Sequence, residues 1–203
     1  MAQSPARSRE QLIEQAAALA SRDERPAVEA LLTRYYWHVP DEDLLARRPE
    51  DLLGAWTSHV EVAEVRPKGT ADVRVHTPTV DEHGWSIGHT VIEIVTDDMP
   101  FLVDSVTARL SQLQRALHLV IHPQLVVRRD PTGRLLEVLD VAGADPGELP
   151  YDCCVESWMH LEIDRESEPA ELVSARASSV GFRFISDGII RFKNQHEFLG
   201  SSA

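Results

Sequence analysis

Lysine and cysteine are almost absent from this chain of 203 residues, which contains two of each. Cys153 and Cys154 are adjacent, and neighbours in sequence rarely form a disulfide or make a zinc site by themselves. We therefore expect packing cysteines in a reduced, cytoplasmic protein, with a reactive thiol as the alternative. The only lysines, Lys68 and Lys193, offer little for a catalytic base or a charge clamp. This scarcity argues against an enzyme.

Positive charge is also scarce, since 20 basic and 33 acidic side chains give a formal net charge of −13. A nucleic-acid-binding protein needs clustered lysine and arginine to displace counterions, and an anionic membrane surface makes the same demand. No apolar run approaches the roughly 20 residues that a membrane-spanning helix needs. Residues 1–7 lead into a polar helix, unlike a signal peptide. We expect neither nucleic acid nor a membrane as a partner.

Motifs for dinucleotide and phosphate binding are missing, because the sequence contains no G-x-G-x-x-G and no G-x-x-x-x-G-K-[ST]. His118 and His122 are four residues apart, but in a predicted strand this spacing separates them by roughly 13 Å. His83 and His89 flank a turn and lack a third ligand. We therefore expect no catalytic, cofactor-binding or metal-binding residue, and structural or surface roles for these histidines.

The first third of the chain has helical periodicity. Pro26 and Pro49 stand where helices begin, Pro40 ends the first of these helices, and Asp41 is a plausible N-cap for a short helix through Leu45. The apolar stripes are Leu12, Ile13, Ala16, Ala17, Leu19 and Ala20; Val28, Leu31, Leu32, Tyr35 and Tyr36; and Leu52, Leu53, Trp56, Val60 and Val62. We expect the last two stripes to pack against the rest of the protein.

The periodicity then changes to two, which indicates strands. We expect strands near 73–77, at 90–96, at 119–129 with a break at Pro123, at 135–141 and at 156–164, turns at 81–84 and 131–133, and helices from Pro100 to about 117 and over 167–177. In the strand at 156–164, Trp158 and His160 alternate with Met159, Leu161 and Ile163. A strand–helix–strand unit of this kind predicts an α+β sandwich of the ferredoxin-like type.

Composition divides the chain into three parts: a helical segment at 1–66, an α+β domain at 67–180, and a tail at 181–203. The tail contains four of the five phenylalanines and the only asparagine. It reads as a small hairpin around Asp187-Gly188. The change of composition suggests that the tail has a different origin from the body. A frameshift, rearranged gene or misannotated reading frame is the simplest account, and a purposeful short protein is the alternative.

Two acidic residues, Asp97 and Asp98, follow the strand at 90–96 and precede the helix expected from Pro100. One interpretation is helix capping, because a carboxylate is favourable at the positive end of the helix dipole. The other is a ligand site, because a strand-to-helix turn presents free N–H groups to a carboxylate while the aspartates suit an ammonium group. An amino acid satisfies both. Arg128-Arg129 reads as a solvated strand end without a role.

Many separate blocks of the sequence resemble one family, over roughly residues 10–175. The blocks are Tyr35–Val39 with Glu42–Leu44, Glu82–Trp85, His89–Val91, Asp97–Val106, His118–Pro123, Arg128–Asp130 and Glu156–Asp164. The segment after the strand looks like the strand–D-x-P-G-L-L–helix signature of ACT domains, which are small regulatory modules that often bind amino acids. Together the blocks resemble the N-terminal region of the large bacterial NAD-specific glutamate dehydrogenases.

The resemblance implies an ACT-like fold and a non-catalytic regulatory or assembly portion of an enzyme that oxidises glutamate to 2-oxoglutarate and ammonia. NAD serves the full-length family, and this chain lacks the catalytic domain. The implied partners are the other domains or subunits of the dehydrogenase. The candidate effector loop comprises Asp97, Asp98, Met99, Pro100, Phe101, Leu102 and Val103. Phe101 stands where amino-acid-binding ACT loops carry glycine, and we expect its ring to fill the ligand space. The alternative function is a stand-alone module that senses an amino acid.

Overall fold

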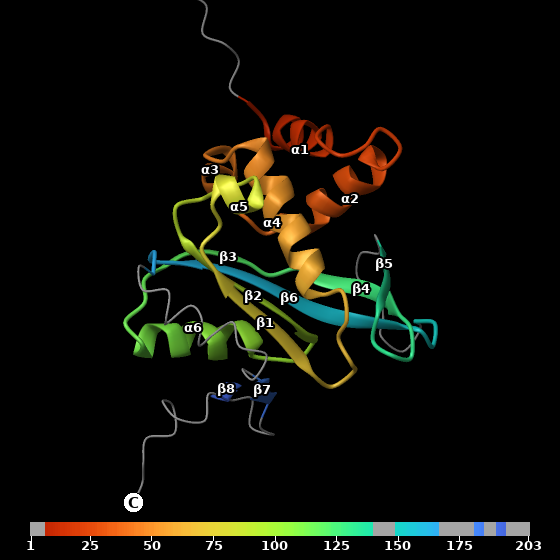
Figure 1. Ribbon diagram of the computed structural model, residues 1–203, viewed down its shortest axis with the longest axis vertical. Helices are drawn as coiled ribbons and strands as arrows, with labels where there is room; N and C mark the ends of the chain where they lie inside the picture. The colour runs from red at the N-terminus through yellow and green to blue at the C-terminus, as the bar shows by residue number, and fades with distance from the viewer. Residues whose placement is uncertain (1–6, 140–148, 167–180, 185–189, 194–203) are drawn as a thin grey trace, which may run out of the picture.

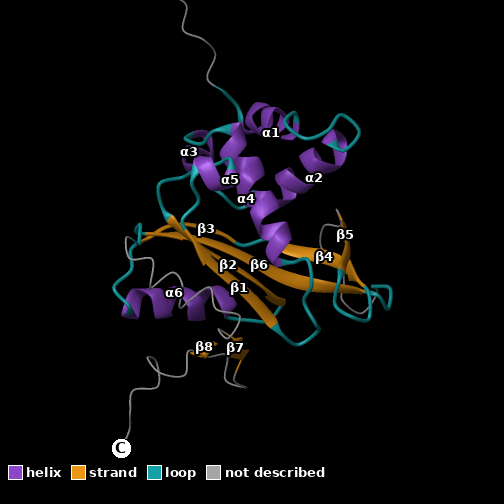
Figure 2. Cartoon of the chain, in the orientation of Figure 1, coloured by secondary structure: helices purple, strands orange, loops and turns teal. Residues whose placement is uncertain are grey.

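The computed structural model describes residues 7–139, 149–166, 181–184 and 190–193. An antiparallel sheet lies between two helical layers, with α1 to α5 on one face and α6 on the other (Figures 1 and 2). The helices are α1 (Arg9–Ala17), α2 (Arg25–Tyr35), α3 (Asp41–Leu45), α4 (Pro49–Val62), α5 (Val80–His83) and α6 (Leu102–Gln112). The strands are β1 (Ala71–His76), β2 (Thr90–Asp97), β3 (Leu117–Ile121), β4 (Gln124–Arg129), β5 (Leu135–Leu139), β6 (Cys153–Ile163), β7 (Gly181–Phe184) and β8 (Ile190–Lys193).

The sheet is built around β6. Its order is β1-β2-β6-β4-β5. β3 also pairs with β6, along residues 160–163, whereas β4 pairs with residues 153–157. Every pairing is antiparallel, so β2 and β3, which flank β6, run parallel to each other and are joined through α6. The predicted α+β class is confirmed as a mixed structure of helices and an antiparallel sheet.

The alternation predicted for β6 separates two hydrophobic cores. Trp158 faces the helices α1 to α4 and stacks on Trp56, with 5.7 Å between ring centroids. Met159, Leu161 and Ile163 face the other way and pack with α6. The helices expected from Pro26 and Pro49 therefore do pack against the sheet, as predicted.

Local sequence explains most helix boundaries. Ser8 and Gln11 form a capping box at the start of α1, and proline stands in the first turn of both α2 and α4. The assignment of Asp41 as an N-cap is wrong, because α3 begins at Asp41 itself and Pro40 precedes it without a side-chain cap. The expected turn at 81–84 is instead the short helix α5, which Thr79 caps and which ends at Gly84 with φ of 77°.

Pro123 divides one expected strand into two. Both halves, β3 and β4, pair with β6, which begins at Cys153, three residues earlier than expected. In the tail, β7 and β8 pair as the predicted hairpin, although its turn at Asp187-Gly188 lies outside the described residues. The helix expected at 167–177 also lies outside them. No helix in the described part of the chain is long and apolar enough to span a bilayer.

Candidate functional site

The two aspartates of the candidate loop are already bound by neighbouring elements. Asp97 Oδ1 accepts a hydrogen bond from Arg66 Nη2 at 2.7 Å, and its Oδ2 accepts one from the Gly69 amide at 2.9 Å. Asp98 accepts from the Ser157 hydroxyl at 2.8 Å and from the Gln124 side-chain amide at 2.9 Å. The capping interpretation is wrong, because neither carboxylate caps α6. Asp97 instead holds the segment between α4 and β1, and Asp98 holds the loop to β4 and β6.

The remaining loop residues divide between the core and the solvent. Leu102 is buried, and Met99 and Val103 pack on the same core. The helix begins at Leu102, two residues after Pro100, because Phe101 takes a left-handed φ of 64°. Phe101 is 74% exposed, so its ring packs little against the described part of the chain, and its place in a ligand space stays a prediction. Glycine adopts this backbone conformation at lower cost than phenylalanine.

A cluster of charged side chains lies behind the loop, centred on the buried carboxylate of Glu156. Arg66 Nε donates to Glu156 Oε1 at 3.0 Å, Arg129 donates to both oxygens at 2.6 and 2.9 Å, and the indole of Trp158 adds a bond at 3.1 Å. Burial alone raises the pKa of Glu156, but the bond from Arg129 and the charge of Arg66 outweigh it, so the pKa lies below its ordinary value. The carboxylate stays ionised.

The structure corrects the role expected for Arg128-Arg129. Arg128 is half-exposed and pairs with Glu137 and Asp152, as a solvated strand end does. Arg129 is 8% exposed, and its Nη1 also donates to the carbonyls of Ala63 and Gly133 at 2.8 and 2.7 Å. Arg129 therefore ties β4 to the segment between α4 and β1.

A second buried array of charges lies between the sheet and the helices above it. His160 Nε2 is 3.4 Å from Glu162 Oε1, and His160 Nδ1 is 3.9 Å from Glu93 Oε1. Arg47 donates to both oxygens of Glu162 at 2.6 and 2.8 Å, and Arg74 Nε donates to Glu93 at 2.8 Å. Basic and acidic side chains thus alternate from Arg47 through to Arg74 and connect four parts of the fold.

The environment sets the charge of each member of this array. Burial lowers the pKa of His160, but Glu162 and Glu93 raise it more, so the pKa lies above its ordinary value. Burial raises the pKa of Glu162, yet His160 and Arg47 bring it down to about 2. The pKa of Glu93 likewise lies well below its ordinary value, despite burial, because of His160 and His76. The array is therefore a set of mutually compensated charges.

His59, on α4, bridges three elements as a neutral side chain. Its Nδ1 is 2.8 Å from the hydroxyl of Tyr35 on α2, and its Nε2 is 3.2 Å from the carbonyl of Ile94 on β2. The carbonyl can only accept, so Nε2 carries the proton and the Tyr35 hydroxyl donates to Nδ1. Burial lowers the pKa of His59 to about 4.

The four histidines considered above as metal ligands, His83, His89, His118 and His122, also have structural partners. His118 bonds to Asp164 at 2.9 Å, and His122 bonds to Ser157 at 2.7 Å, so the two histidines serve different neighbours. The rings of His89 and His118 stack at 4.1 Å between centroids. Within the described residues, no three histidine, cysteine, aspartate or glutamate side chains are placed to hold a metal ion.

The cysteines and one serine are the remaining candidate nucleophiles. Burial, followed by the nearby Glu156, raises the pKa of Cys154, which suits a packing thiol better than a reactive one. Residues 84–88 read G-W-S-I-G, a pattern found at nucleophilic serines that sequence reasoning missed. Here the motif connects a helix to a strand, the reverse of the strand-to-helix turn that such a serine needs, and the Ser86 amide donates to Asp51.

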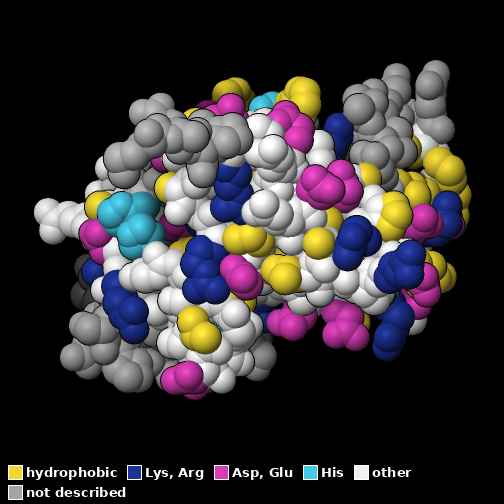
Figure 3. Space-filling model, turned by 90° about the horizontal axis from the view of Figure 1, so that it is seen from above, with side chains coloured by type: hydrophobic (Ala, Val, Ile, Leu, Met, Phe, Trp, Pro, Cys, Tyr) yellow, Lys and Arg dark blue, Asp and Glu magenta, His cyan; other side chains and the backbone are white. Residues whose placement is uncertain are grey.

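Sequence reasoning also missed the glutamates and arginines that hold the structure together. Glu93 lies in a β-branched strand at an inward position, and Glu156 and Glu162 share the face of β6 that carries Trp158. Charge within an otherwise apolar strand was the available signal. Elsewhere the charges are spread out: the face in Figure 3 carries acidic and basic side chains scattered among apolar ones.

Comparison with known proteins gives one family. Residues 31–178 match the family described as glutamate dehydrogenase, ACT1 domain. An NAD-specific glutamate dehydrogenase from Halomonas elongata is 37% identical over 168 residues, which cover 83% of this chain and 10% of that protein. One from Pseudomonas aeruginosa is 34% identical over 147 residues, covering 72% of this chain and 9% of that protein. No solved structure matches.

The chain thus spans about a tenth of the length of the curated relatives it matches. The family match takes in the candidate loop, the Glu156 cluster and the array around His160. On this match, the chain belongs to the family of glutamate dehydrogenase ACT1 domains.

Proposed function

We propose that this chain is the non-catalytic, ACT-like regulatory and assembly portion, at the N-terminal end, of a cytoplasmic NAD-specific glutamate dehydrogenase. The parent enzyme converts glutamate and NAD to 2-oxoglutarate and ammonia, with NAD bound by a domain outside this chain. The single observation that carries the proposal is the family match over residues 31–178. In the two dehydrogenases compared above, the segment that matches this chain is about a tenth of the protein.

The architecture supports an ACT-like domain of ferredoxin-like type. The unit β2–α6–β3, with β6 between the two parallel strands, is the split strand–helix–strand arrangement of that fold. The buried charges support a structural role. Glu156, Glu162 and Glu93 all interact with cationic side chains of the same chain, which suits a rigid body against which other domains pack.

The test uses the Pseudomonas aeruginosa relative. Its matched segment is deleted in one variant and replaced by the matching residues of this chain in another. We expect the deletion to lose assembly or the response to effectors, and the replacement to restore it, as measured by light scattering and by glutamate-dependent formation of NADH. Glutamate oxidation by the isolated chain would refute the non-catalytic assignment. Unchanged assembly and kinetics after deletion would refute the regulatory and assembly role.

The alternative, a stand-alone amino-acid sensor, makes a different prediction. Its ammonium-binding groups would be Asp97 and Asp98, which already accept four hydrogen bonds from this chain. The sensor would give saturable heat in calorimetry with an amino acid. Because these groups are already bound, our proposal predicts no saturable heat with any of a panel of amino acids. Saturable heat that Asp98→Ala abolishes would favour the sensor over our proposal.

A further inference from the structure

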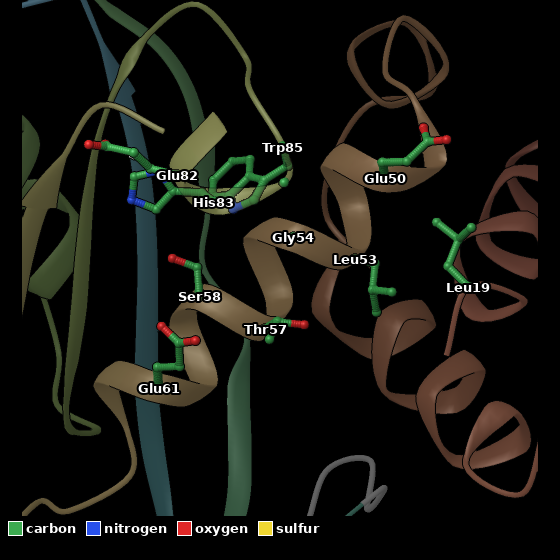
Figure 4. Close-up of a pocket in the computed structure, with 11 residues that line it drawn as sticks. Leu19, Glu50, Leu53, Gly54, Thr57, Ser58, Glu61, Glu82, His83 and Trp85 are labelled. Atoms are coloured by element: carbon green, nitrogen blue, oxygen red, sulfur yellow. Dashed lines mark ion pairs between the residues drawn. The ribbon is translucent and has the colours of Figure 1, made fainter. Parts of the chain in front are cut away.

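A groove of about 460 Å³ runs along the outer face of α4 (Figure 4). One wall is Leu19, just after α1, and the opposite wall is α5 with the residues that follow it. The lining residues are Leu19, Glu50, Leu53, Gly54, Thr57, Ser58, Glu61, Glu82, His83, Gly84 and Trp85. None of them belongs to the candidate loop, and Ser58 and Glu61 touch the array around His160 through Arg74 at its end.

The floor of the groove is apolar and fixed in place. Leu19 is half-exposed, Leu53 is half-buried, and the indole of Trp85 is 3% exposed beneath them. Trp85 packs directly on the backbone of α4, because a Cβ added at Gly54 would lie 2.2 Å from Trp85 Cγ. In Figure 4, the side chain of Leu53 projects from α4 beside Leu19. An apolar side chain of a partner therefore has a preformed place to pack.

The rim of the groove is acidic. The side chains of Glu50, Glu61 and Glu82 are 42%, 64% and 75% exposed, and no lysine or arginine among the described residues lines the groove. Glu50 pairs with Arg48 at 3.2 Å, and Glu61 pairs at 3.0 Å with Arg74, which also bonds to the buried Glu93. The pair of Glu50 is exposed on both sides and contributes little to stability, so it exchanges readily for a pair with a partner.

The spacing of these residues suits a helix. Glu50, Gly54, Thr57 and Glu61 follow one another on one side of α4 at helical intervals, and the distance from first to last is about 16 Å at 1.5 Å per residue. The short side chain of Thr57 allows close approach, because the distance between packed helices depends on the residues at the contact, whereas Trp85 of this chain already covers Gly54. An apolar middle between two acidic ends complements a helix with basic ends.

We infer that this groove binds a basic amphipathic helix from another part of the longer dehydrogenase chain. The inference rests on the proposed function, which supplies the partner, since about nine tenths of each relative lies outside the matched segment. Charge complementarity selects the partner: a chain of net charge −13 with an acidic groove repels acidic segments and attracts basic ones. The apolar floor then holds the helix by burying its aliphatic side chains.

The test measures binding of the whole chain to labelled synthetic peptides of about twenty residues, long enough for the about 16 Å face. The peptides overlap and cover the Pseudomonas aeruginosa relative outside its matched segment. Fluorescence anisotropy is recorded at about 0.05 M and about 0.5 M salt, because screening at the higher concentration weakens exposed ion pairs. The groove variants are Glu50→Gln/Glu82→Gln and Leu19→Asp, and the matched control is Glu14→Gln/Glu29→Gln, which removes the same charge elsewhere.

We expect a basic amphipathic peptide to bind, about fivefold more weakly with Glu50→Gln/Glu82→Gln, and more weakly with Leu19→Asp and at high salt. The control variant should bind as the parent chain does. The inference is overturned if no peptide binds, if the bound peptides are acidic, or if the control loses as much affinity as the groove variant. A failure here leaves the replacement experiment intact, whereas failure of the proposed function appears in that experiment first.

Discussion

Replacing Glu156 by glutamine should destabilise the fold more than any surface change. The substitution keeps the shape of the side chain but removes the carboxylate that bonds to both Arg66 and Arg129, each of them nearly fully buried. Breaking a buried ion pair by removing one partner costs about 3–5 kcal/mol, because the remaining charge stays buried without compensation. Asp97 still faces Arg66, so Arg129 is the group left without a counter-charge.

Urea unfolding followed by tryptophan fluorescence measures this cost. With a slope of about 2 kcal/mol per molar urea, a loss of about 4 kcal/mol moves the midpoint down by about 2 M. The matched control is Glu137→Gln, which removes the same charge from an exposed pair with Arg128 and should cost less than about 1 kcal/mol. A loss of under about 1 kcal/mol for Glu156→Gln would refute the reasoning that the cluster holds β6 and β4 to the chain before β1.

The pH dependence provides a second check on the same variant. The pKa of Glu156 is lowered in the folded state, so its stabilisation is present above its ordinary value of 4.5 and is lost as the pH falls below that value. The difference in unfolding free energy between the parent chain and Glu156→Gln should therefore be constant near neutral pH and shrink in acid. A difference independent of pH would contradict an ionised Glu156.

Three further changes test other parts of the structure. Because burial holds the pKa of His59 down to about 4, the free energy of unfolding should fall as the pH drops from 6.5 towards 4. Nuclear magnetic resonance should show His59 titrating with a midpoint of about 4, and a midpoint near 6.5 would contradict its burial. Gly54→Ala should cost about 1–3 kcal/mol by thermal unfolding, because the new methyl group displaces Trp85; an unchanged transition would mean that the indole moves freely. Phe101→Gly should leave stability unchanged or raise it by up to about 1 kcal/mol, because it relieves a left-handed backbone and sacrifices little burial; a clear loss would show that the ring has a partner.

Local sequence predicted the elements well where the signal was local. Proline marked the starts of α2 and α4, and alternation along residues 156–163 separated the two faces of β6 before any partner strand was known. Hydrophobic periodicity and the prolines at helix starts are local features, so a single sequence is enough to recognise them.

The candidate site was harder to predict because its contacts join distant residues. Arg129 looked like a solvated strand end, and only the register of β4 on β6 places it against Glu156, 27 residues away. The aspartates at 97 and 98 looked available for a cap or a ligand until Arg66 and Ser157 were placed beside them. A buried charge needs a partner of opposite charge, but the residues next to it in the sequence do not show which distant residue that partner is.

The position of β6 has a consequence for how the protein folds during synthesis. β6 is the last of the six strands of the sheet along the chain, yet without it only the pairs β1–β2 and β4–β5 can form. Until Ile163 leaves the ribosome, the nascent chain therefore has two antiparallel strand pairs that are not hydrogen-bonded to each other. Trp56 in its helical segment also lacks Trp158, the ring on which it stacks. Such incomplete chains expose apolar surface and unpaired strand edges to other molecules. Release of β6 then joins both halves at once, which makes folding of this sheet a single event that waits for its last strand.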